Sequence, residues 1–107
     1  SVIDSNRLFW SHFFVDFYIE EYNLAIEFLG DYWHANPLLY EEDEKISYSY
    51  GVKAAKEIWQ KDKVREEYLS NKYNISFLHV WEKDVNDDFE KTFNNLKEEI
   101  KNAIGKR

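Results

Sequence analysis

Two short runs of aromatic and β-branched residues, separated by only three positions, constrain the fold of this chain more than any other feature. The first run covers residues 13–19 and the second covers residues 23–28. Residues of these types favour β-strands, and a connection as short as Glu20-Glu21-Tyr22 is typical of a β-hairpin. The sequence therefore predicts an antiparallel hairpin early in the chain.

Each strand of this hairpin carries one carboxylate. If Ile19 pairs with Leu24, Asp16 lies directly across from Glu27 on the same face. Opposed side chains have Cβ atoms about 4.5–5.5 Å apart, so two carboxylates there repel each other unless they share a proton or a cation. Oxygen ligands alone suit Mg²⁺ or Mn²⁺. A register shifted by one residue would instead turn one carboxylate to solvent, and the spacing alone leaves both arrangements open.

The remainder of the chain predicts two helices and one more strand. Residues 30–48 are expected to form a loop, residues 51–71 a helix and residues 75–81 a strand. A last helix is expected to start at Asn86 or Asp87, either of which can cap it. Its apolar residues recur at helical spacing: Phe89, Phe93, Leu96, Ile100 and Ile104. The order β-β-α-β-α predicts an α/β fold in which a small mixed sheet is flanked by helices.

The net charge of −7 does not favour nucleic-acid binding, because nucleic-acid-binding proteins usually present a basic surface. The charge is uneven, however, and residues 53–72 hold six Lys or Arg against four Asp or Glu. Lys53, Lys63 and Arg65 are candidates for contacts with DNA phosphates. A solvated helix face is the better explanation for most of the basic residues of this segment.

Composition also excludes several classes of protein. The chain has no cysteine, which rules out disulfides and thiolate metal sites. It contains no apolar run long enough to span a bilayer, and its start lacks a signal-peptide pattern. These features predict an intracellular, cytoplasmic protein that does not associate with a membrane.

The segment Gly30-Asp31-Tyr32-Trp33-His34 directly follows the second carboxylate strand. His34 could exchange a proton with water or with a leaving oxygen. Trp33 could present its ring to a base or a sugar. Each also has a plainer interpretation, which is a structural hydrogen bond for His34 and core packing for Trp33.

Asp62 falls in the middle of the apolar face of the predicted helix, between Ala55 and Leu69. A charged residue in that position needs a partner. Arg65, Lys63 or a metal site could supply one. A structural salt bridge and a catalytic role are both consistent with this placement.

Three blocks of this sequence resemble the nuclease core of the very short patch repair endonucleases and of related phage homing endonucleases, within the PD-(D/E)XK nucleases. The blocks are residues 15–34, 59–69 and 77–82, in the family's order and spacing. The resemblance implies a restriction-endonuclease-like fold and metal-dependent cleavage of double-stranded DNA, by a homing or mismatch-nicking type of enzyme encoded by a phage or mobile element. It also implies that residues 1–107 are a single catalytic domain, expected to be a piece of a longer protein.

The resemblance assigns roles to four residues. Asp16 matches the family's metal-binding aspartate, and Glu27 occupies the strand that carries the second acidic ligand in the wider group. His34 matches the histidine taken as the general acid or base, and Asp62 matches an acidic position of the family's helix. The resemblance thus implies Asp16 and Glu27 as ligands of Mg²⁺ or Mn²⁺, with His34 and Asp62 completing the catalytic set.

Two departures from the family keep other hypotheses open. Leu29 stands where relatives often have a second histidine, and no helix carrying an acidic residue is apparent before the first strand. A catalytically disabled, DNA-binding module with the same fold is therefore a second hypothesis. An acid–base enzyme on a non-nucleic substrate, such as a glycosidase using Asp16 and Glu27, is a third. A double-strand break would favour a homodimer, although no segment indicates an interface.

Overall fold

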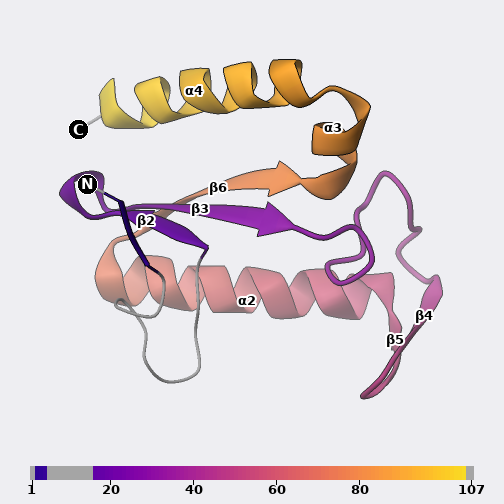
Figure 1. The fold of residues 1–107 in the computed structure, drawn as a ribbon. Helices are drawn as coiled ribbons and strands as arrows, with labels where there is room; N and C mark the ends of the chain where they lie inside the picture. Colours follow the sequence, from indigo (N-terminus) through magenta and orange to yellow (C-terminus); the bar gives the residue numbers. More distant parts are fainter. Residues whose placement is uncertain (1, 5–15, 106–107) are drawn as a thin grey trace.

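The structure, a computed structural model, describes residues 2–4 and 16–105 and places two long helices on opposite faces of a small sheet (Figure 1). The sheet has four strands in the order β1-β2-β3-β6. Their bounds are Val2–Asp4 for β1, Phe17–Ile19 for β2, Leu24–Leu29 for β3 and Ser76–Trp81 for β6. The β1–β2 and β2–β3 pairs are antiparallel and β3–β6 is parallel, which confirms the predicted small mixed sheet flanked by helices.

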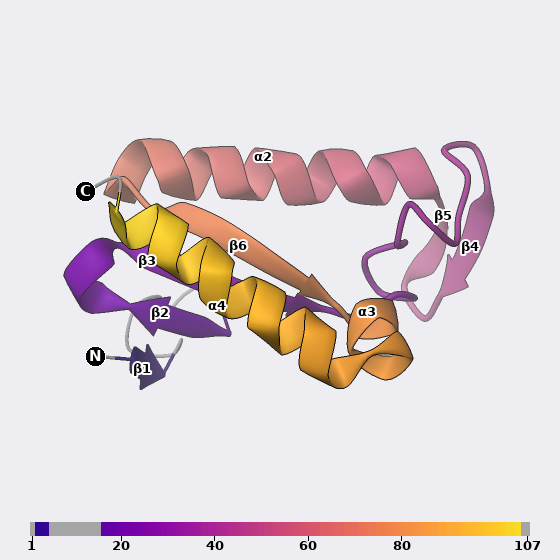
Figure 2. The same cartoon turned by 90° about the horizontal axis from the view of Figure 1, so that it is seen from above.

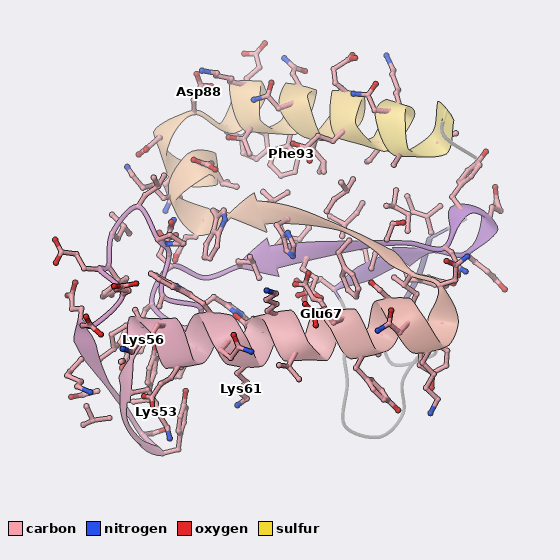
Figure 3. All side chains as sticks on the ribbon, turned by 180° about the vertical axis from the view of Figure 1, so that it is seen from behind. Lys53, Lys56, Lys61, Glu67, Asp88 and Phe93 are labelled. Atoms are coloured by element: carbon pink, nitrogen blue, oxygen red, sulfur yellow. The ribbon has the colours of Figure 1, made fainter. Side chains whose placement is uncertain are left out.

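The helices are α2 (Ala55–Tyr73), the short α3 (Glu82–Asp87) and α4 (Phe89–Gly105). In Figure 1, α4 lies above the sheet and α2 lies below it, and the view from above shows α4 crossing over the strands (Figure 2). Figure 3 shows Phe93 pointing from α4 toward the sheet. None of the helices in the described residues is long and apolar enough to cross a membrane.

The predicted hairpin and its register are confirmed. Ile19 pairs with Leu24 and Phe17 with Ile26, and a 3₁₀ turn, η1 (Glu20–Tyr22), joins the two strands. Asn23 closes this turn in the left-handed conformation, with φ 51°. Asp16 precedes β2 directly, and residues 13–15 of the predicted first strand lie outside the described residues.

The two faces of the hairpin alternate as the sequence predicted. Ile26 packs with Val80 and Leu96 on the side covered by α4. Tyr18 and Ala25 pack with Leu69 on the side covered by α2. Because side chains alternate along a strand, Glu27 shares the α2 side with Ala25.

The loop predicted over residues 30–48 is wrong for its last four residues, which form a strand. Residues Lys45–Tyr48 form β4, which pairs with β5 (Gly51–Ala54) in a separate two-stranded sheet. Consequently α2 begins at Ala55 and not near Gly51. Carbonyl oxygens of Glu44 and Glu42 accept hydrogen bonds from the first amides of α2, at 2.9 Å each, so the residues before β4 cap this helix.

The start of the last helix also differs from the prediction. Asn86 and Asp87 belong to α3, and the cap of α4 is Asp88, whose Oδ1 accepts a hydrogen bond from the backbone N–H of Lys91 at 3.0 Å. The side chain of Asp88 therefore satisfies an amide that the first turn of α4 leaves without an intrahelical partner.

Candidate active site between helix α2 and the sheet

Helix α2 faces the sheet with apolar residues near its two ends and with charged residues in its middle. One cluster near its C-terminal end consists of Tyr18, Ala25, Leu69 and Ile75. Another near its N-terminal end consists of Ala35, Ile46, Tyr48, Ala55 and Ile58. Asp62, Arg65 and Glu66 lie between them on the same helix face, because positions three or four apart share a face. The two clusters thus hold a charged segment of α2 against the sheet.

A cavity of about 280 Å³ opens at this charged segment. Four of its lining residues are the catalytic candidates predicted from sequence: Asp16, Glu27, His34 and Asp62. Arg65, Leu29 and Phe28 complete the lining. Residues from the first hairpin, the segment after β3 and the middle of α2 therefore meet at one place.

Glu27 is the buried charge of this cavity. Only 8% of its side chain is exposed, and its Oε1 accepts a hydrogen bond from Nη1 of Arg65 at 2.7 Å. Burial raises the pKa of Glu27 above its usual range, although Arg65 partly offsets this effect by favouring the ionised carboxylate. Arg65 is thus turned into the cavity, 23% exposed, and is not a free surface cation.

His34 is the partner of Asp62. Nδ1 of His34 lies 2.9 Å from Oδ2 of Asp62, and this hydrogen bond raises the pKa of the imidazole. The cations suggested by the sequence as partners of Asp62 make other contacts: Arg65 binds Glu27 at 2.7 Å, and Lys63 lies 3.9 Å from Glu67. A carboxylate that binds one imidazole nitrogen fixes the ring and leaves the other nitrogen to exchange protons.

The segment that carries His34 is fixed on both sides of the histidine. The backbone N–H of His34 donates to the carbonyl oxygen of Gly30 at 3.0 Å, and Nε1 of Trp59 donates to the carbonyl oxygen of Ala35 at 2.6 Å. Ala35 has φ 49°, a left-handed conformation uncommon for a residue with a side chain. Asn36, 1% exposed, donates from Nδ2 to Oδ1 of Asp31 at 2.9 Å. These contacts hold the imidazole against α2.

Asp16 lies at the rim of the cavity. Its Oδ2 accepts a hydrogen bond from the backbone N–H of Phe28 at 2.7 Å, which holds the carboxylate beside the strand that carries Glu27. Among residues 2–4 and 16–105, no cluster of three or more His, Asp or Glu side chains is arranged to hold a metal ion. Mg²⁺ is nevertheless often bound through only one or two carboxylates, with waters and substrate phosphates as the other ligands. Asp16 and Glu27 both line the cavity and are its two carboxylates from the first hairpin.

A second histidine–carboxylate pair borders the first. Nε2 of His79, on β6, lies 2.6 Å from Oε2 of Glu66, and this hydrogen bond raises the pKa of His79. Neither His79 nor Glu66 was predicted as a site residue from the sequence. Two signals could have found them: strand alternation places His79 on the α2 side with Phe77, and Glu66 follows Asp62 by one helical turn.

The other predicted DNA contacts lie outside the cavity. Lys53 is exposed on β5, Lys63 is exposed on α2, and Trp33 is 57% exposed with its ring centroid 5.8 Å from that of Tyr48. Figure 3 shows Lys61, between Lys53 and Lys63 in the sequence, pointing away from the sheet. The structure therefore brings together the acidic residues, His34 and Arg65, but not the remaining basic or aromatic candidates.

The raised pKa values of the two histidines predict how stability depends on pH. Because folding favours the protonated imidazoles, their stabilisation is complete below the unfolded pKa of about 6.5 and is lost as the pH rises through the higher folded values. We expect the melting temperature of the native chain to fall more between about pH 6 and about pH 8 than that of a His34→Gln/His79→Gln variant. Thermal melts followed by circular dichroism at both pH values test this, and an equal fall in the two chains would contradict it.

Comparisons with known proteins give no further guide to this site. No family model, curated protein or solved structure matches the chain. Any functional assignment therefore depends on the residues of the cavity and on the three sequence blocks described above.

Proposed function

We propose that this protein is a metal-dependent endonuclease that hydrolyses phosphodiester bonds in double-stranded DNA, of the homing or mismatch-nicking type. One observation carries the proposal: Asp16, Glu27, His34 and Asp62 line a single cavity although they come from distant segments of the chain. By the sequence resemblance, Asp16, His34 and Asp62 correspond to site positions of the very short patch repair endonucleases, and Glu27 lies on the strand that carries the second acidic ligand in the wider PD-(D/E)XK group. The order of strands and helices is consistent with a restriction-endonuclease-like core, which is part of this proposal.

In this proposal Asp16 and Glu27 hold Mg²⁺ or Mn²⁺. A bound divalent ion supplies the positive charge that polarises a phosphate and lowers the pKa of a water molecule. Arg65 already lies beside Glu27 and provides a second, permanent cation for a phosphate oxygen. The two carboxylates would complement the positive charge of a hydrated divalent ion, and the guanidinium would complement the negative charge of a phosphodiester.

His34 is the proton acceptor of the proposed reaction. Its Nδ1 is held by Asp62, so Nε2 is the nitrogen left to take a proton from the attacking water. Asp62 orients the ring and stabilises the imidazolium that forms, as the carboxylate of a catalytic triad does. The water oxygen then forms its bond to phosphorus as the bond to the leaving oxygen breaks.

The contact between Glu27 and Arg65 favours a second candidate, a DNA-binding module of the same fold that has lost catalysis. One of the two proposed metal ligands is occupied by this guanidinium at 2.7 Å. Leu29, which cannot transfer a proton, also lines the cavity. This candidate predicts salt-sensitive DNA binding without metal-dependent turnover.

Cleavage of supercoiled plasmid separates the two candidates. We expect nicking or linearisation with Mg²⁺ or Mn²⁺, no cleavage with EDTA, and a loss of at least about 100-fold in Asp16→Ala. Asp43→Ala is the matched control, because this exposed aspartate binds Lys56 on the surface and lies outside the cavity. Binding without cleavage by the native chain would support the inactive module, and full activity of Asp16→Ala would contradict the assignment of the metal ligand.

A further inference from the structure

A second cavity, of about 230 Å³, adjoins the first and shares three lining residues with it, Leu29, His34 and Asp62. Its remaining walls include Pro37, Trp59 and Trp81, and it also reaches Glu66 and His79. Two histidine–carboxylate pairs therefore face one small space that is walled mainly by apolar side chains. Only the pair formed by His34 and Asp62 is used in the mechanism proposed above.

The two pairs are arranged in parallel. Asp62 and Glu66 are four residues apart on α2, and each binds one imidazole, at 2.9 Å and 2.6 Å. His34 uses Nδ1 for this bond, whereas His79 uses Nε2. Within the described part of the chain, Nδ1 of His79 makes no hydrogen bond. Each ring thus keeps one nitrogen available for proton exchange.

The His79–Glu66 pair forms part of the wall of the second cavity. His79 lies between Phe77 and Trp81 on the α2 side of β6, where an apolar side chain would continue the packing. The pair lies at the edge of this cavity, where 36% of the His79 side chain and 22% of the Glu66 side chain are exposed. An imidazole that is bound by a carboxylate at the wall of a cavity, and that keeps its other ring nitrogen without a hydrogen bond, is a candidate proton-transfer group.

Position distinguishes the two histidines. His34 lines both cavities and therefore lies beside Asp16 and Glu27 as well as beside the second pair. Of these two cavities, His79 lines only the second. In a displacement at phosphorus the attacking and leaving oxygens lie on opposite sides of the phosphorus atom, roughly in line. A phosphate seated between the two imidazoles in the second cavity would have one of them on each side.

We propose that His79, oriented by Glu66, donates the proton to the leaving oxygen while His34 accepts the proton of the attacking water; this inference rests on the proposed nuclease function. The water oxygen forms a bond to phosphorus, and the electron pair of the broken phosphorus–oxygen bond goes to the leaving oxygen. That oxygen receives the proton from Nδ1 of His79, and Nε2 of His34 receives the proton of the water. Solvent then returns both imidazoles to their starting states, so the net reaction consumes one water and gives a phosphomonoester and an alcohol.

Replacing the leaving oxygen with sulfur tests this role. A thiolate leaves without needing a proton, so a general acid is required for an ordinary phosphodiester but not for a bridging phosphorothiolate. The cleavage position of the native chain is mapped on a DNA duplex, and a second duplex is made with sulfur in place of that leaving oxygen. Single-turnover rates at fixed pH and Mg²⁺ or Mn²⁺ concentration are then compared on both duplexes.

We expect His79→Ala to cut the ordinary duplex about 100-fold more slowly than the native chain, and the sulfur duplex less than about threefold more slowly. Glu66→Gln should show the same pattern to a smaller degree, because it acts through His79. His34→Ala is the matched control and should lose activity on both duplexes, since the attacking water is the same in each. Circular dichroism melts of each variant establish that it is folded.

The outcomes separate this inference from the proposal on which it rests. No metal-dependent cleavage by the native chain overturns the nuclease function and the role of His79 together. Cleavage by the native chain with an equal loss on both duplexes in His79→Ala, or with no loss on either, overturns the role of His79 alone.

Discussion

Arg65→Met is expected to lower the free energy of unfolding by about 3 kcal/mol, because it leaves the carboxylate of Glu27 buried without its cation. This value is at the low end of the range for buried pairs, since 23% of the Arg65 side chain is exposed. The loss of unfolding free energy should be larger at higher pH. Burial already raises the pKa of Glu27, and without Arg65 its ionisation in the folded protein costs more free energy. Urea unfolding at about pH 6 and about pH 8 measures both effects.

Two further variants test the cause of this loss. In Glu27→Met/Arg65→Met the buried charges are removed together, and most of the lost stability should return. Lys63→Met is the control on the same helix, because its partner Glu67 is exposed and 3.9 Å away, and it should change stability by less than about 0.5 kcal/mol. If the double variant were as unstable as Arg65→Met, packing of the arginine stem would be the cause instead of the unpaired charge.

Asp62→Asn is expected to reduce the single-turnover rate of DNA cleavage by about two to three orders of magnitude if the proposed function is correct. An asparagine amide can donate to Nδ1 of His34, which moves the ring proton to Nε2 and removes the acceptor for the proton of the attacking water. The side-chain volume hardly changes, so the melting temperature should stay close to that of the native chain. Plasmid cleavage with Mg²⁺ provides the rate.

The matched control for this variant is Glu67→Gln, which neutralises an exposed carboxylate of the same helix. It should cleave at nearly the native rate. His34→Ala should lose about as much as Asp62→Asn, and combining the two changes should add little, because residues that act as one unit are not additive. A rate for Asp62→Asn within about threefold of the native chain would remove Asp62 from the mechanism.

The hairpin and the alternation of its faces could be predicted because both depend on neighbouring residues alone. Ile19 and Leu24 are close in sequence, and the period of two then fixes which face Asp16 and Glu27 share. The β4–β5 pair was missed because strongly polar and acidic residues precede it and its strands have only four residues each. Lys53 and Ala54 favour a helix in isolation, yet they pair with residues 45 and 46, and tertiary contacts override their propensity.

The candidate site could be predicted only in part for a related reason. Asp16, Glu27, His34 and Asp62 could be named from alternation and from the three sequence blocks. Which cation meets which carboxylate could not, because it depends on how far α2 slides and rotates over the sheet. A shift of one helical turn would bring Asp62 near the place of Glu66, and local sequence contains no information on that placement. The pairing of Arg65 with Glu27 therefore required the structure.

The attachment of α2 by an apolar cluster near each end has a consequence for how such a chain can change over time. The apolar residues that hold this helix in place do not line the first cavity, so the charged residues of the cavity can be exchanged without changing these apolar contacts. Positions 62, 65 and 66 could be exchanged for other side chains without moving the helix, provided that each charge is replaced together with the group it binds. A scaffold divided in this way can acquire a different chemistry, or lose its chemistry altogether, through a few paired substitutions while its architecture persists.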